Sequence, residues 1–298
     1  MDVSGLRSPA ALNTPAAVRR MIGKMKDPKV VSGWISKNSP HLAAWGLFAT
    51  TLLFVAHFLS DRDFSFLMTV ASLISMFAFL MVFVNIAAVR SAAGVSVKMV
   101  ELYTIVIIAR LCSILPFEGY LPYDRTGDWL YQTVEVLCLV LALGILFISK
   151  RTFSNTYDPA NDSFPILYLI IPTLALAILF HPSLNNFMPC DIAWTFAIYL
   201  ESFACLPQLF LFQKEGTVQP FTGHFLAGQT LSKFLGFLFW VSSYTELNMS
   251  AKGIKRFVGI WVILMQVMQL VVMADFLWHY LRCLAKGRPI KFLLSPEV

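Results

Sequence analysis

The chain has 298 residues, of which 57% are hydrophobic and only 13% are charged, and its mean hydropathy is +0.69. Soluble domains carry about 25% charged residues, so this composition excludes a soluble globular protein, and its apolar content excludes a disordered chain. The five cysteines are scattered and form neither a disulfide framework nor a zinc motif. The composition therefore predicts an all-α polytopic membrane protein.

Eight apolar runs approach the length of about 20 residues that a helix needs to cross the hydrocarbon core. In chain order these predicted spans are 41–59, 66–88, 98–117, 129–148, 164–180, 192–212, 224–241 and 257–284. The preceding segment 1–40 is polar and basic and lacks the apolar core of a cleavable signal peptide. The connections between the spans are short, so we expect no separate soluble domain.

The distribution of Lys and Arg predicts the orientation in the membrane. Eight spans place both chain ends on one side, and this side receives 16 of the 23 Lys and Arg residues. Five fall on the opposite side and two lie within spans. The positive-inside rule then places both termini in the cytosol. This bias, together with attraction to anionic lipid, accounts for the net charge of +6, so we expect no nucleic-acid partner.

Charged side chains inside the spans are the strongest functional signal, because a charge at membrane depth costs about 2.5–3.5 kcal/mol on insertion scales. The five intramembrane charges are Arg110, Glu135, Glu201, Lys233 and Asp275. Helical spacing predicts three polar and aromatic stripes on otherwise apolar helices. The stripes contain Tyr103, Arg110 and Ser113; Asp191, Trp194, Glu201 and Gln208; and Gln229, Lys233, Gly236, Trp240 and Ser243. We expect these stripes to face one shared polar cavity.

The predicted cavity receives Arg110 and Lys233 from different helices. Arg offers a planar fork that suits a carboxylate, and Lys offers a point charge. A zwitterionic or carboxylate-bearing ligand, such as a peptide C-terminus or an amino acid, fits this chemistry. Asp191, Glu201 and Asp275 would neutralise the basic pair or hold a ligand ammonium. In the alternative interpretation, the charges pair with one another and only lock the bundle.

The sequence contains no motif for catalysis or metal binding. A Gly-rich phosphate loop, HExxH and G-x-S-x-G are all absent. We therefore expect neither an enzyme nor a bound cofactor or metal.

The stretch Ile192–Phe210 resembles helix five of the KDEL receptors, the ER lumen protein-retaining receptor family. It carries the pattern W-x-F-x-x-Y-L-E-x-x-x-x-L-P-Q-L, which includes Glu201 and the pair Pro207-Gln208. Further similar segments are 90–98, 156–158, 220–224, 274–276 and 285–287. The resemblance covers about residues 65–298.

The resemblance implies a seven-helix core at 63–284, in which a linker helix joins two three-helix bundles as in the SWEET and PQ-loop families. It makes 41–62 an additional transmembrane helix, 1–40 a basic cytosolic segment and 285–298 a cytosolic tail. It also implies a multi-pass receptor of ER and Golgi membranes. Such a receptor binds C-terminal retrieval peptides of K/HDEL type on lumenal ER proteins for Golgi-to-ER retrograde transport, and acidic Golgi pH favours capture.

The resemblance implies seven ligand-binding residues in this sequence: Arg110, Asp191, Trp194, Glu201, Lys233, Trp240 and Asp275. Lys233 replaces a family arginine. Ser232, Ser243 and Ser113 stand where the family has a tyrosine, a second arginine and an acidic residue. The span 66–88 contains no counterpart of the family's pH-sensing histidine. These departures indicate an altered retrieval signal or a changed ligand.

Two other functions also fit the sequence. One is a SWEET-like or PQ-loop transporter of a small solute. The other is a trafficking scaffold whose basic ends bind coat proteins or lipid. The tail residues Lys286, Arg288 and Lys291 fit either a positive-inside anchor or a coat-recruitment signal.

Overall fold

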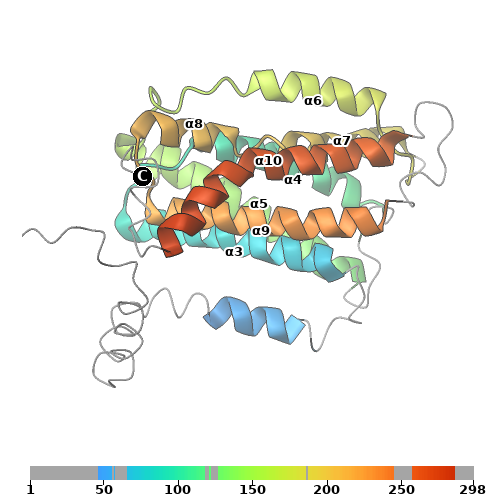
Figure 1. Ribbon diagram of the computed structural model, residues 1–298, viewed down its shortest axis with the longest axis horizontal. Coiled ribbons are helices and arrows are strands. Elements are labelled where there is room, and N and C mark those ends of the chain that lie inside the picture. Colours follow the sequence, from blue (N-terminus) through green and yellow to red (C-terminus); the bar gives the residue numbers. More distant parts are fainter. Residues whose placement is uncertain are drawn as a thin grey trace, which may run out of the picture. The chain divides into compact units, whose positions relative to one another are not determined.

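A computed structural model describes residues 46–55, 57, 66–117, 121, 127–185, 187–244 and 257–285 (Figure 1). The chain divides into two compact units, residues 1–55 and 56–298. In the first unit, the apolar helix Gly46–Val55 covers part of the first predicted span. The basic segment 1–40 and the tail residues Lys286, Arg288 and Lys291 lie outside the described residues. The domain boundaries 1–40, 41–62, 63–284 and 285–298 therefore stay predictions.

The second unit is built from helices, with no strand among its described residues. The α-helices are α3 (Phe66–Val89), α4 (Val97–Ile114), α5 (Gly127–Phe147), α6 (Leu167–Leu179), α7 (Met188–Glu201), α8 (Leu206–Glu215), α9 (Pro220–Ser242) and α10 (Val258–Ala285). A π-helical turn, Ile148–Thr152, continues α5, and a short 3-10 turn, Ser154–Thr156, follows it. The predicted span 192–212 is not one continuous α-helix, because the chain is broken between α7 and α8.

The helices form two groups of three that pack against each other. In the first group α5 packs against both α3 and α4, and in the second α10 packs against both α9 and α7. The groups meet where α3 packs on α9 and α4 packs on α7. Helix α6 packs on α7 at the periphery and connects the two groups in sequence (Figure 1). The predicted seven-helix core of two three-helix groups and a linker helix is confirmed.

Four helical segments among the described residues are long and apolar enough to cross a membrane: Phe66–Val89, Trp129–Thr152, Met188–Glu215 and Val258–Cys283. Helix α6, with 13 residues, is shorter than the usual span. Helices α4 and α9 are more polar, since they carry Arg110 and Lys233. The chain is a polytopic membrane protein, and its core helices α4, α5, α7 and α9 each carry a charged side chain at membrane depth.

Local sequence signals explain where several helices begin and end. Ser96 is the N-cap of α4, and its hydroxyl accepts a hydrogen bond from the backbone N–H of Met99 at 3.1 Å. Proline stands in the first turn of α7, α8 and α9, where a missing N–H leaves no intrahelical bond unmade. Gly216 ends α8 with φ of 64°, a conformation that favours glycine.

The break between α7 and α8 lets the side chain of Gln208 hold the loop before α4. Its Nε2 donates to the carbonyl of Gly94 at 3.0 Å, and its Oε1 accepts from the backbone N–H of Ser96 at 2.8 Å. Gly94 has φ of 75°, and a Cβ at this position would lie 2.4 Å from Cγ of Gln219. The Pro-Gln pair therefore fixes α8 against the start of α4, which carries Arg110 at its other end.

We expect Gln208→Leu to lower the free energy of unfolding by about 1–3 kcal/mol, because it leaves a buried N–H and a buried carbonyl without partners. Chemical unfolding of the detergent-solubilised protein measures the change. Gln213→Leu is the matched control, since Gln213 is exposed on the same helix. Equal effects of the two substitutions would contradict a locking role for Gln208.

Candidate functional site: a charged cavity between two helix groups

A cavity of about 60 Å³ lies where the two helix groups meet. Helices α3, α4, α5, α7, α9 and α10 all contribute to its wall. Five of the seven predicted ligand-binding residues line it: Arg110, Trp194, Glu201, Lys233 and Trp240. The prediction that the three polar stripes converge on one cavity is therefore correct for these residues.

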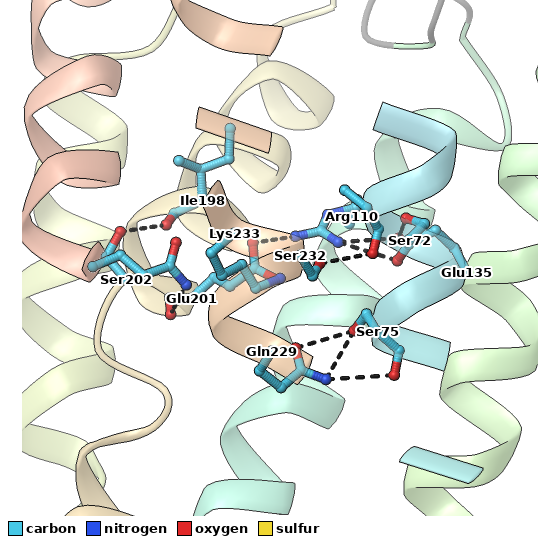
Figure 2. A network of polar contacts seen from close by, with 12 residues as sticks. Ser72, Ser75, Arg110, Glu135, Ile198, Glu201, Ser202, Gln229, Ser232 and Lys233 are labelled. Carbon is cyan, nitrogen blue, oxygen red and sulfur yellow. Dashed lines mark hydrogen bonds and ion pairs between the residues drawn. The ribbon is translucent and has the colours of Figure 1, made fainter. Parts of the chain in front are cut away.

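Four buried charges form one continuous network beside the cavity (Figure 2). The Arg110 Nη2 atom lies 2.6 Å from Oε2 of Glu201, and the Lys233 Nζ atom lies 2.6 Å from Oε1 of the same carboxylate. The Arg110 Nη1 atom donates to both oxygens of Glu135 at 3.2 Å. The four side chains are each at most 11% exposed. Glu201 thus joins a cation of the first helix group to a cation of the second.

The break after α7 places Glu201 at the last helical position, where its backbone carbonyl accepts a hydrogen bond from the N–H of Ala204 at 3.2 Å. The side chain of Gln269 on α10 donates to that carbonyl at 2.9 Å. Lys233 is held in turn by the polar contacts of its own helix with α3, where Ser232 donates to the carbonyl of Ala71 at 2.7 Å. The acid and the lysine are therefore positioned by hydrogen bonds from neighbouring helices.

Aromatic side chains make up much of the remaining wall. Trp194 and Trp240 meet edge to face, with ring centroids 5.0 Å apart. The Tyr103 ring packs edge to face against Phe79 and Phe225. Tyr103 lines the cavity, and its buried hydroxyl has no hydrogen-bond partner among the described residues. A buried hydroxyl without a partner is costly, so this group is available to a polar ligand.

Two predicted residues do not line the cavity. Asp191 is buried at the start of α7, where one oxygen accepts a hydrogen bond from the backbone N–H of Asn185 at 3.3 Å. The Asp275 side chain is 86% exposed on α10, and one oxygen lies 3.6 Å from Nε2 of His279. The assignment of these two residues to ligand binding stays a prediction that the cavity does not support.

Glu135 is a charged cavity residue that lies on none of the three predicted stripes. Helix α5 is apolar over most of its length and Glu135 is its one intramembrane charge, although Tyr131 lies one turn before it and also lines the cavity. Ser72 on α3, which donates a hydrogen bond to Glu135, is uncharged and therefore does not stand out among the polar residues of the sequence. The signal that was present is the charge itself at membrane depth, since such a residue requires a partner.

The network combines the two interpretations that the sequence left open. The basic pair does converge on a cavity, but two internal carboxylates neutralise it. The two cations and two carboxylates sum to no net charge, which removes much of the penalty for burying them. The network therefore links the two helix groups, and the cavity beside it offers room for a small polar group.

A family model and the individual relatives that match this chain all point to one protein family. A sequence model of the ER lumen protein retaining receptor family matches residues 91–243. The ER lumen protein-retaining receptor of Drosophila melanogaster is 31% identical over 216 residues, which is 72% of this chain and 92% of that protein. ER lumen protein-retaining receptor 2 of Xenopus tropicalis is 30% identical over 202 residues, 67% of this chain and 86% of that protein.

We expect Lys233→Met to lower the free energy of unfolding by about 3–5 kcal/mol, because it removes one partner of a buried ion pair. Lys214→Met is the matched control, since Lys214 is an exposed lysine bonded to Ser163 and should cost below about 1 kcal/mol. Unfolding in detergent measures both. A loss at Lys233 no larger than that at Lys214 would mean that the network contributes little to stability.

Proposed function

This chain belongs to the ER lumen protein-retaining receptor family, and on that premise we propose that it is a membrane receptor for the C-terminal retrieval peptides of lumenal ER proteins. The peptides are of K/HDEL type, and the receptor returns their carriers from the Golgi to the ER. The role is binding rather than catalysis. The names of its relatives support retention as the function, and the chemistry of the cavity supports a carboxylate as the group that is recognised.

One observation carries the proposal: Arg110 and Lys233, from different helix groups, both lie 2.6 Å from oxygens of one carboxylate beside a cavity. The two cations thus already have the spacing that a carboxylate requires. A guanidinium and an ammonium that bind one carboxylate from two sides form strong charge-assisted hydrogen bonds. A peptide C-terminus carries such a group at the end of a flexible chain.

The size of the cavity limits what can bind without a movement of helices. A volume of about 60 Å³ has room for a few water molecules or one small functional group. Sites for larger ligands occupy about 300–1,000 Å³. A retrieval peptide therefore enters only when the two helix groups separate, and its terminal carboxylate is the part that reaches the charged network. The free hydroxyl of Tyr103 offers a further contact to it.

The topology belongs to the same proposal. The chain crosses ER and Golgi membranes several times with both termini in the cytosol, as the distribution of Lys and Arg favours. Residues Lys286, Arg288 and Lys291 then lie on the cytosolic side, where they bind coat proteins or anionic lipid. Peptide capture takes place from the lumen.

A small-solute transporter is the second candidate, and the volume of the cavity favours it. A site of about 60 Å³ between two three-helix groups suits a small ion or a short amino acid better than a tetrapeptide. Flux of amino acids and small carboxylates into proteoliposomes tests this function. If the wild type transports one of these solutes and Lys233→Met abolishes the transport, the chain is a transporter and the receptor assignment fails.

We expect a peptide that ends in HDEL with a free carboxylate to bind the purified protein, and its C-terminal amide to bind more weakly. Arg110→Gln should weaken the free-acid peptide by roughly 10- to 150-fold, because one charge-assisted contact contributes about 1.5–3 kcal/mol. Titration at mildly acidic and at neutral pH measures both peptides.

Arg151→Gln is the matched control, because Arg151 is exposed and lies outside the cavity. Arg110→Lys keeps a positive charge and serves if Arg110→Gln does not fold. Absence of saturable binding by the folded wild-type protein at both pH values would remove the K/HDEL assignment. A library of free-carboxylate tetrapeptides then separates a changed signal from no peptide ligand.

A further inference from the structure

Glu135 on α5 contacts the Nη1 side of the Arg110 guanidinium, within the first helix group. Both of its oxygens accept from Arg110 Nη1, and its Oε1 also accepts from the hydroxyl of Ser72 (Figure 2). Glu135 is 2% exposed and lines the same cavity as Arg110. A carboxylate of the chain itself therefore already fills one side of the guanidinium that would bind a ligand carboxylate.

The two acids of the network are not equivalent. Glu201 contacts both cations and connects α4 of one helix group to α9 of the other. Among the described residues, Glu135 is paired with the single cation Arg110, and that contact joins α5 to α4 within the first group. Releasing Glu201 would break the link between the helix groups. Releasing Glu135 would leave that link intact and would free Arg110 Nη1.

Charge balance makes an exchange necessary. Arg110 and Lys233 are already matched by Glu135 and Glu201, so the network has no net charge. A ligand carboxylate added to the intact network would leave an uncompensated negative charge in a site that is largely shielded from water, which is expensive. A ligand carboxylate can therefore take the place of Glu135 on Arg110 only if the charge of Glu135 also leaves the buried network, because the displaced acid would otherwise be the uncompensated one. Separation of the helix groups, which the size of the cavity already requires for a peptide, gives the displaced side chain access to water.

We propose that Glu135 is an internal competitor for the ligand carboxylate on Arg110, and that it is the residue that sets the affinity and selectivity of this site. The inference rests on the proposed function for the identity of the ligand, a free carboxylate. The competition itself rests on the contacts of Glu135 alone. Without a ligand, Glu135 neutralises Arg110. Binding is then restricted to carboxylates that bind Arg110 more strongly than Glu135 does.

The first test supplies a carboxylate from solution. Glu135→Ala removes the internal acid and leaves space next to Arg110 that acetate or formate fits. Thermal unfolding of the full-length protein in detergent is measured with increasing sodium acetate and with sodium chloride at the same ionic strength. A ligand that binds only the folded state raises the unfolding temperature, so we expect acetate to raise it saturably in the variant.

Wild type and Glu101→Ala are the controls. Glu101, like Glu135, is a carboxylate in an ion pair. Its partners are Lys98 and Lys150, and it does not line the cavity. We expect neither protein to respond to acetate beyond its response to chloride. An equal response of all three proteins, or no response of Glu135→Ala, would overturn the inference.

The second test uses Glu135→Gln, which keeps the size of the side chain and serves if Glu135→Ala does not fold. We expect it to bind the free-acid HDEL peptide at least tenfold more tightly than wild type, with no such gain for the C-terminal amide. If the wild type binds the peptide, unchanged or weaker binding of the free acid by Glu135→Gln would overturn the inference. If neither protein binds peptide while acetate stabilises Glu135→Ala, the proposed function fails and the competition at Arg110 stands.

Discussion

The structure depends on the requirement that charges buried in a membrane protein be neutralised within it. Arg110 and Lys233 come from different helix groups, and neither could remain at this depth without an anion. Glu201 meets the requirement for both at once, with one oxygen 2.6 Å from each cation. The same contacts that neutralise the charges therefore hold the two helix groups together, and a ligand that competes for these cations acts directly on the contact between the groups.

The surrounding architecture serves to place this carboxylate. The chain breaks after Glu201, and the side chain of Gln269 on α10 donates a hydrogen bond to the Glu201 carbonyl. Beyond the break, Gln208 binds the loop that precedes α4, the helix that carries Arg110. One interrupted helix thus positions both the acid and, through the start of α4, its arginine partner. Under the proposed function, the small cavity beside the network corresponds to a closed form of the site, in which Glu135 and Glu201 occupy the cations that a ligand carboxylate would bind.

Much of this arrangement follows from the sequence. The apolar runs predicted the core helices, and the spacing of Arg110, Glu201 and Lys233 predicted their convergence, because the period of an α-helix fixes which side chains share a face. The break inside 192–212 could not be read from hydropathy, since the residues on both sides are apolar. Glu135 was visible as an intramembrane charge, but its partner could not be predicted, because the pairing depends on how α5 packs against α4. The exposed position of Asp275 likewise depends on the rotation of α10 about its axis, and its spacing alone does not define that rotation.

The bridge between the helix groups is tested most directly by a double-mutant cycle on Arg110 and Glu201. Free energies of unfolding are measured for wild type, Arg110→Met, Glu201→Met and the double variant. If Glu201 binds Arg110 across the two groups, the double variant should lose less than the sum of the single losses, by about 1 kcal/mol or more. Losses that add within about 0.5 kcal/mol would show that the two residues do not interact, and would contradict the account.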